Sequence, residues 1–251
     1  VARYRAEDLD RVIDAINAKG YGLTFGMHSR ITDRVEQVIR RISVGNVYVN
    51  RNQIGAIVGS QPFGGHGLSG TGPKAGGPLY LHRFTDATQA FLPPEAGRPI
   101  APDRLARALS ALPAPTLDPA RLTDLPGPTG ESNRYGTTGR APVLCLGPGA
   151  ARAEEQAAEV RAAGASALAA APGAPEIDGR VTPEMLARLP VLAAVVYEGD
   201  DAAAYARALA SREGPIVPLL TGTDFARWCV HEVSISVDTT AAGGNAELLA
   251  G

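Results

Sequence analysis

Residues 55–77 read Gly55-Ala-Ile-Val-Gly-Ser-Gln-Pro-Phe-Gly-Gly-His-Gly-Leu-Ser-Gly-Thr-Gly-Pro-Lys-Ala-Gly-Gly77, and four residues separate them from the β-branched run Val47-Tyr-Val-Asn50. Nine of these 23 residues are glycine. A tract this dense in glycine disfavours a helix or a regular strand, because each glycine loses extra backbone entropy on ordering. A flexible linker is the alternative, but linkers rarely carry apolar residues such as Ile57, Phe63 and Leu68. We therefore predict a functional loop whose backbone passes close to a ligand.

The residues before this loop predict a strand–helix–strand unit. Apolar residues recur with a helical period over residues 8–18 and again over 31–42, which predicts two amphipathic helices. Residues 23–28 and 46–50 predict two buried strands. A crossover of this length is right-handed, so the two strands should be parallel neighbours. After the loop, the partly alternating polarity of residues 79–91 predicts a strand or a long ribbon.

The second half of the chain predicts a linker followed by a layered unit. Residues 92–140 are rich in Pro and Gly and predict a linker over a surface, with one short helix near 103–112. From residue 141 onward, expected strands alternate with expected helices, which predicts a Rossmann-like, doubly wound α/β domain. The expected strands are 143–146, 191–197, 216–220 and 231–237, and the expected helices are 152–163, 185–188 and 202–211.

Composition excludes several classes of function. The net charge of −2 and the lack of a Lys/Arg-rich stripe argue against nucleic-acid binding. No apolar run approaches the roughly 18 residues that span a bilayer, so no transmembrane segment is expected. Cys145 and Cys229 lie far apart, which indicates a reducing cytoplasm rather than a disulfide framework. No His and acid cluster has metal-ligand spacing, so no metal is expected.

Five segments resemble the aldehyde dehydrogenase superfamily, and more narrowly the L-glutamate γ-semialdehyde (pyrroline-5-carboxylate) dehydrogenase module of the bifunctional proline-utilisation flavoenzymes, the PutA family. Asn46–Gly59 and Gln61-Pro-Phe-Gly-Gly65 carry the superfamily pattern. The resemblance is restricted to the PutA family by two segments, Gln53–Ala56 and Gly72–Pro78. Leu125-Pro-Gly-Pro-Thr-Gly-Glu-Ser-Asn133 and Asp238-Thr-Thr-Ala-Ala-Gly-Gly-Asn245 match as well.

The resemblance implies an α/β fold and an oxidoreductase activity. The expected reaction is NAD-dependent oxidation of glutamate semialdehyde to glutamate, with FAD in an upstream proline dehydrogenase domain. The chain starts at Val1 without Met, so we expect a segment of a longer polypeptide. The nucleophilic Cys, the general-base Glu and the Glu that holds the nicotinamide ribose are expected upstream. A peripheral inner-membrane location and a homo-oligomer stay open.

By the same resemblance, the substrate-binding residues are Gly55, Ala56 and Phe63. Backbone N–H groups at Gly55 and Ala56 are expected to bind the substrate α-carboxylate, because small residues leave amide donors uncovered. The alternative is a plain tight turn. Phe63 is expected to pack beside the aliphatic part of the substrate, and the alternative is an ordinary core aromatic residue.

Other candidates receive structural interpretations. Ser69–Gly72 could form an anion-binding nest, but we expect it to shape the loop. His66 is expected to be a solvated or hydrogen-bonded surface residue. Gly147-Pro-Gly149 follows a strand as in a dinucleotide-binding turn, yet Arg152 replaces the third glycine of that fingerprint. We therefore expect a Rossmann-like domain without nucleotide binding.

The cysteines do not suit nucleophilic catalysis. Cys145 lies within an apolar strand, where burial raises the thiol pKa and blocks access. Cys229 follows Trp228 in a short amphipathic stretch without the context expected of a catalytic cysteine. We therefore expect no catalytic residue in this chain.

The expected organisation has four parts. Residues 1–91 form the C-terminal part of an aldehyde dehydrogenase catalytic domain with a β-flap, and 92–140 form the linker. Residues 141–237 form the non-catalytic domain, and 238–251 form a tail that covers the substrate cavity. Two rival functions remain: a structural or interaction module, and an aldehyde dehydrogenase piece with another substrate.

Overall fold

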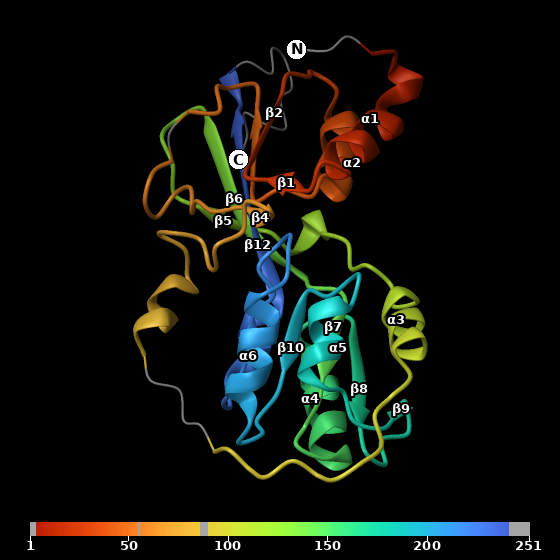
Figure 1. Cartoon of the computed structure of the whole chain (residues 1–251). Helices are drawn as coiled ribbons and strands as arrows, with labels where there is room; N and C mark the ends of the chain where they lie inside the picture. Colours follow the sequence, from red (N-terminus) through yellow and green to blue (C-terminus); the bar gives the residue numbers. More distant parts are fainter. Residues whose placement is uncertain (1–3, 55, 86–89, 241–251) are drawn as a thin grey trace. The chain divides into compact units, whose positions relative to one another are not determined.

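The computed structural model describes residues 4–54, 56–85 and 90–240, and the chain forms two compact units (Figure 1). The first unit is built from the residues before Phe84, from Thr116–Thr137 and from Glu232 onward. The second unit is built from Phe84–Pro115 and Thr138–His231. Both units therefore combine segments that are far apart in the sequence, which a reading of the chain as consecutive domains does not anticipate.

The first unit opens with the expected strand–helix–strand arrangement. Its elements are the 3-10 helix η1 (Ala6–Asp8), α1 (Leu9–Asn17), β1 (Tyr21–Gly22), β2 (Thr24–Met27), α2 (Thr32–Arg41) and β3 (Asn46–Val49). Strands β2 and β3 pair in parallel, as predicted. Gly20, with φ of 74°, adopts the left-handed conformation that ends α1. The short strand β4 (His66–Gly67) returns to pair with β1 in an antiparallel two-stranded sheet.

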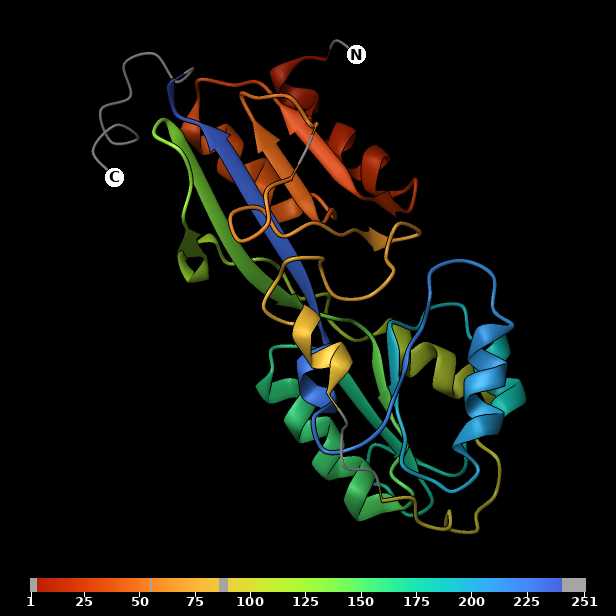
Figure 2. The same cartoon turned by 90° about the vertical axis from the view of Figure 1, so that its left-hand side faces the viewer.

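The last strand, β12 (Val230–Asp238), lies in the sheet of the first unit, whereas we expected residues 231–237 to complete the Rossmann-like domain. The strand order is β2-β3-β12-β6-β5, with β12 parallel to β3 and hydrogen-bonded to β6 (Figure 2). Val233, Ile235 and Val237 join one core, whereas the alternating Ser234 and Ser236 face polar partners. An interior strand of a doubly wound sheet is apolar on both faces, so this alternation suits β12 to its observed place.

The region between residues 92 and 140 contains more regular structure than the expected linker. The short helix is present as α3 (Pro102–Ser110), but η3 (Pro119–Arg121), β5 (Thr123–Leu125) and β6 (Glu131–Gly139) follow it. Strands β5 and β6 form an antiparallel hairpin in which Asp124 faces Arg134. The hairpin loop includes Gly130 with φ of 86°. The strands carry few apolar residues, so periodicity alone gave no signal for them.

The expected ribbon over residues 79–91 is wrong in its described part. Tyr80–Phe84 forms a 3-10 helix, η2. Its hydrogen bonds are local, from Tyr80 N to Gly77 O at 3.1 Å and from His82 N to Leu79 O at 3.3 Å. A strand needs a neighbour that supplies ladder partners, and polarity that alternates over a few residues does not provide one.

The second unit is a doubly wound parallel sheet, which confirms the predicted α/β class. Its strands are β7 (Val143–Cys145), β8 (Ala167–Ala171), β9 (Ile177–Asp178), β10 (Ala194–Val196) and β11 (Leu219–Leu220). The order β11-β10-β7-β8-β9 places the first strand in the centre, and all four described pairings are parallel. This is the arrangement of dinucleotide-binding folds, with a topological switch point between β7 and β10.

Helices cover both faces of this sheet. Leu105 and Leu109 of α3 join a core that also includes residues of α5 (Pro183–Arg188) and α6 (Ala202–Ala210). Helix α4 (Ala150–Ala162) and the 3-10 helix η4 (Phe225–Trp228) contribute to the opposite core, where Phe225 is fully buried. Strand β8 was not predicted, because a run of alanines has weak β propensity and only its central, buried place makes it a strand.

A buried lysine fixes the glycine-rich segment of the first unit to its sheet. Lys74 is 2% exposed, and its Nζ donates to Asn46 Oδ1 and to Gly64 O, both at 2.7 Å. The Lys74 amide donates to Glu232 Oε2 at 2.7 Å, and Tyr135 donates to the other oxygen of Glu232 at 2.7 Å. These bonds tie the glycine-rich segment to β3, β6 and β12.

The burial of Lys74 predicts a pH-dependent stability. Burial lowers the pKa of its ammonium from 10.5 to about 7, although the charge of Glu232 opposes the shift. Between these pH values the unfolded chain binds more protons than the folded chain, so the free energy of unfolding should rise with pH. We expect Lys74→Met to remove this rise, as measured by urea unfolding at a series of pH values.

The matched control is Lys19→Met, because Lys19 is exposed in the turn after α1. This variant should keep the pH dependence of the wild type. Equal slopes in the wild type and in Lys74→Met would show that the Lys74 ammonium is not perturbed by the fold.

Candidate functional site

The candidate substrate loop leaves β3 at a residue with a left-handed backbone. Asn50 has φ of 59°, a conformation that asparagine tolerates better than most residues. Its side chain accepts from Ser29 N at 2.9 Å and donates to Ser29 O at 3.0 Å. The loop that follows therefore starts from a fixed point at the carboxyl end of β3, where parallel sheets commonly hold their ligands.

Ala56 is exposed, and Gly55 lies outside the described residues. The Ala56 amide donates to no residue in the described part of the chain. The turn is instead closed behind it, where Ser60 N and Gln61 N both donate to Ile57 O, at 3.1 and 2.7 Å. Carboxylate binding requires free amide donors, and the exposed position of Ala56 is compatible with that role, while the assignment of Gly55 and Ala56 stays a prediction.

Phe63 is half-buried in the glycine-rich segment. Its backbone exchanges two hydrogen bonds with Ala75, at 3.0 and 2.8 Å. The preceding Pro62 O accepts from Asn46 Nδ2 at 2.9 Å and from Ser234 Oγ at 2.8 Å. The backbone on both sides of the ring is therefore held in place, and its contact with a substrate stays a prediction.

A polar cluster that the sequence did not single out lies beside this loop. Arg51 and Gln61, at the two ends of the loop, bind Glu131 of β6 and Ser236 of β12. Glu131 lies within Leu125–Asn133, a segment that drew attention only by resemblance. Its pairing with the loop required the hairpin and β12 to be placed in one sheet, which no periodicity indicates.

The remaining candidates in the glycine-rich segment have structural roles. His66 is 7% exposed, and its Nε2 lies 2.9 Å from Glu232 O, so the expectation of a surface residue is wrong. The sequence predicted a surface position because His66 lies in a glycine-rich loop, but β12, which is distant in the sequence, covers this loop. Ser69 N donates to His66 O and Gly70 N to Gly67 O, each at 3.0 Å. Those two amides are used within the turn, as the predicted loop-shaping role requires.

Both thiols are buried among apolar side chains of the second unit. Burial raises the pKa of Cys145 far above its usual range and that of Cys229 to about 12. A thiol of this kind is neither accessible nor ionised near neutral pH, and the thiolate is the nucleophilic form. These two residues are structural.

The switch point of the second unit is filled by the chain itself. Residues 92–99 cross the carboxyl ends of the strands: Leu92 bridges to Gly199, Glu95 N donates to Pro148 O at 3.0 Å, and Pro99 bridges to Arg180. The Glu95 carboxylate lies against Gly149, the N-cap of α4, where a Cβ would come within 2.2 Å of Glu95 Oε1. An anionic group thus already lies where a bound pyrophosphate would meet the helix N-terminus.

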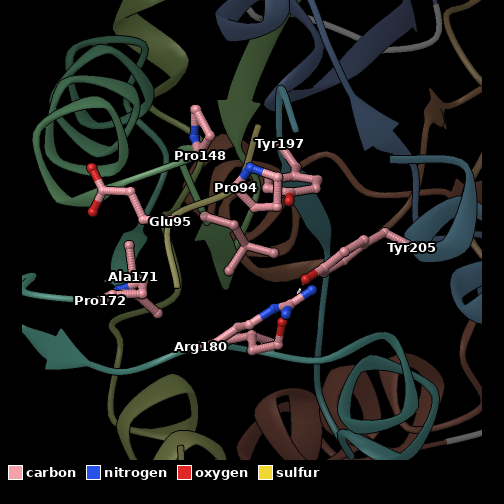
Figure 3. A pocket seen from close by; sticks show the side chains of 11 residues that line it. Pro94, Glu95, Pro148, Ala171, Pro172, Arg180, Tyr197 and Tyr205 are labelled. Carbon is pink, nitrogen blue, oxygen red and sulfur yellow. Dashed lines mark hydrogen bonds between the residues drawn. The ribbon is translucent and has the colours of Figure 1, made fainter. Parts of the chain in front are cut away.

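The space left at the switch point is too small for a nucleotide. Glu95, Pro148, Pro172 and Tyr197 are among the residues that line a cavity of about 20 Å³ (Figure 3), which is roughly the room of one water. Arg152, in place of the third glycine, donates from Nε to Glu198 at 2.7 Å. The described residues at this switch point therefore leave no room for NAD.

Among residues 4–54, 56–85 and 90–240, no group of three or more His, Cys, Asp and Glu side chains could hold a metal ion. None of the helices within these ranges is both long and apolar enough to cross a membrane.

The chain is similar to aldehyde dehydrogenases and to PutA proteins. The model of the Aldehyde dehydrogenase family matches residues 1–90. The whole chain is 41% identical to the "Bifunctional protein PutA" of Rhizobium meliloti and covers 23% of it. The chain is also 49% identical to "1-pyrroline-5-carboxylate dehydrogenase 1" of Halalkalibacterium halodurans over 81 residues. This match covers 32% of the chain and 16% of the relative.

A solved structure supports the fold. The structure of proline utilization A (PutA) from Corynebacterium freiburgense aligns with 92% of this chain and 24% of its own, at a TM-score of 0.55 and 23% identity. The chain spans about a quarter of the length of these PutA relatives. Residues 1–90 thus match the aldehyde dehydrogenase family, and the chain as a whole is similar to one part of the bifunctional PutA proteins.

Proposed function

We propose that this chain is part of a bifunctional proline-catabolic enzyme, in which it serves the oxidation of L-glutamate γ-semialdehyde to L-glutamate. The observation that carries the proposal is the similarity of the whole chain to PutA, joined to the separate similarity to a 1-pyrroline-5-carboxylate dehydrogenase. Glutamate semialdehyde is the hydrolysed, open-chain form of pyrroline-5-carboxylate, so the name of the second relative points to this substrate.

The first unit would hold the substrate. The exposed amide of Ala56, together with that of Gly55, would bind the α-carboxylate, and the ring of Phe63 would pack beside the aliphatic chain. Two aligned amide donors suit a carboxylate because the charged acceptor strengthens each bond. Asn50 and the bonds around Pro62 hold the loop ends, so little backbone entropy is lost on binding.

The second unit would be a non-catalytic cover domain. The segment 92–99 occupies its switch point, and the cavity there leaves no room for a dinucleotide. The tail from residue 238 would cover the substrate cavity, although residues 241–251 lie outside the described part of the chain. In place of the four consecutive parts expected from the sequence, the proposal assigns these roles to the two units, with the tail in the first unit.

The cofactor chemistry would come from the rest of a PutA-type polypeptide. NAD supplies the oxidising equivalent for the aldehyde, and FAD serves the proline dehydrogenase step. The nucleophilic Cys and the two Glu residues would also be contributed there, because Cys145 and Cys229 are buried. Free, buried cysteines agree with the proposed cytoplasmic location.

Two rival functions are less well supported. A purely structural or interaction module would not need an exposed loop whose Ala56 amide has no bond within the described residues. An aldehyde dehydrogenase segment of different specificity would not be expected to resemble PutA over its full length. The similarity to a pyrroline-5-carboxylate dehydrogenase also favours glutamate semialdehyde.

The isolated chain should have no dehydrogenase activity, because the reactive thiolate and the cofactor site would lie in the rest of the polypeptide. The measurement is NADH formation from glutamate semialdehyde, compared with buffer alone. A rate above buffer would contradict the assignment of the chemistry to other segments.

Gly55→Val in a PutA-type enzyme that contains this chain should raise the KM for glutamate semialdehyde, because the side chain would cover the amide donors. The expected rise is roughly 10- to 100-fold, since a hydrogen bond to a charged group contributes about 1.5–3 kcal/mol. Steady-state kinetics should also show little change with a simple aldehyde that has no carboxylate.

The control is Val58→Ala, because Val58 lies in the same loop with 85% of its surface exposed. It should leave both substrates unaffected. Unchanged kinetics of Gly55→Val with glutamate semialdehyde would remove the carboxylate-anchor assignment.

A further inference from the structure

The loop from Arg51 to Gln61 is held at both ends by one carboxylate. Arg51 Nη1 donates to Glu131 Oε2, and Gln61 Nε2 donates to Glu131 Oε1 at 2.7 Å. Glu131 is 70 residues beyond Gln61 in the sequence. Its two oxygens therefore bridge the start and the end of the loop that carries Ala56.

Two neutral side chains complete this clamp, which we define as Arg51, Gln61, Glu131, Asn133 and Ser236. Ser236 Oγ accepts from Arg51 at 2.8 Å and from Gln61 at 3.1 Å, and it donates to Asn133 Oδ1 at 2.6 Å. Asn133 Nδ2 donates to Glu131 Oε1 at 2.9 Å. Each loop end thus contacts both β6 and β12.

The clamp is buried enough for its charges to matter. Gln61, Asn133 and Ser236 are each 2% exposed, and the side chains of Arg51 and Glu131 are 17% and 16% exposed. In such surroundings a charge that loses its partner is costly. The guanidinium of Arg51 also lies 5.3 Å from the ring centroid of Tyr48, which restricts its position further.

The residues between the clamped ends have little support of their own. Ile54 is 82% exposed and Val58 is 85% exposed. Gln53 accepts from Thr24 Oγ1 at 3.2 Å, and Asn52 accepts from Ile54 N at 3.2 Å. A loop with an apolar, exposed tip depends on its fixed ends for its shape, and a fixed shape lowers the entropy cost of binding.

We propose that Glu131 is a positioning residue for substrate binding: the clamp holds the Arg51–Gln61 loop in the conformation that presents its amides to the substrate carboxylate. The loop follows β3, but its shape is set by β6 and β12, two strands from much later in the sequence. Glu131 itself touches no substrate and acts through Arg51 and Gln61. The kinetic effect of the clamp rests on the proposed function, whereas the existence of the clamp does not.

The test is Glu131→Gln in a PutA-type enzyme that contains this chain, since glutamine keeps the size of the side chain and removes its charge. Hydrogen–deuterium exchange reports the mobility of the peptide that spans residues 52–60 without reference to activity. Steady-state kinetics with glutamate semialdehyde and with a simple aldehyde reports the positioning effect.

We expect the Ser60 amide of this peptide, which donates to Ile57 O, to exchange about fivefold faster or more, because the loop end opens locally more often. The KM for glutamate semialdehyde should rise roughly tenfold while kcat stays within about twofold, since a misplaced anchor weakens binding of substrate and transition state alike. The kinetics with the simple aldehyde should not change. Ser236→Ala, which removes one partner of each loop end, should have the same effects in milder form.

Glu198→Gln is the matched control. Glu198 has a side chain that is 12% exposed and accepts from Arg152 at 2.7 Å and from Gln156 at 3.2 Å, so it repeats the Arg–Glu–Gln chemistry in the second unit. This variant should lose stability without a change in exchange at 52–60 or in KM.

The outcomes separate the clamp from the proposed function. Unchanged exchange in Glu131→Gln and in Ser236→Ala would overturn the clamp. Faster exchange with an unchanged KM would overturn the positioning role. A wild type that does not oxidise glutamate semialdehyde would overturn the proposed function, and the exchange data would still decide whether the clamp exists.

Discussion

The pairing of β12 with β3 is the contact on which the first unit depends. The register joins Ile235 to Val47 and Val237 to Val49, so backbone bonds link segments that lie 188 residues apart in the sequence. The apolar face of β12 completes the core, and its opposite face supplies Ser234 and Ser236 to the segments that leave β3. One strand therefore stabilises the sheet and at the same time fixes the loop proposed to bind substrate.

Buried polar groups on this sheet show how a glycine-rich segment acquires one conformation. Lys74, Asn46 and Glu232 bond to its backbone on one side, and the clamp around Glu131 holds the preceding loop. Glycine contributes no side-chain packing, so hydrogen bonds must supply the order that a core normally provides. Each such bond is most valuable where water is excluded, since an unsatisfied partner there is costly.

In the second unit, by contrast, the chain itself occupies the place where this fold usually binds a ligand. Its parallel sheet has the strand order of a dinucleotide-binding domain, but Glu95 and its neighbours lie across the switch point. The anion-attracting end of α4 meets a carboxylate of the same chain. The fold can thus persist as a packed layer after the space for its ligand has been closed, because apolar cores on both sheet faces hold it together.

Local pattern was sufficient for the elements that follow from neighbours in sequence. The period of α1 and α2, the β-branched run of β3 and the crossover between β2 and β3 could all be predicted, and so could the α/β class and the resemblance in Asn46–Gly65. The sequence did not reveal β8, the β5–β6 hairpin, the burial of His66, the clamp or the sheet to which β12 belongs. Those features depend on which distant segments pair, and pairing is decided by burial and hydrogen-bond satisfaction over the whole fold, which no local window contains.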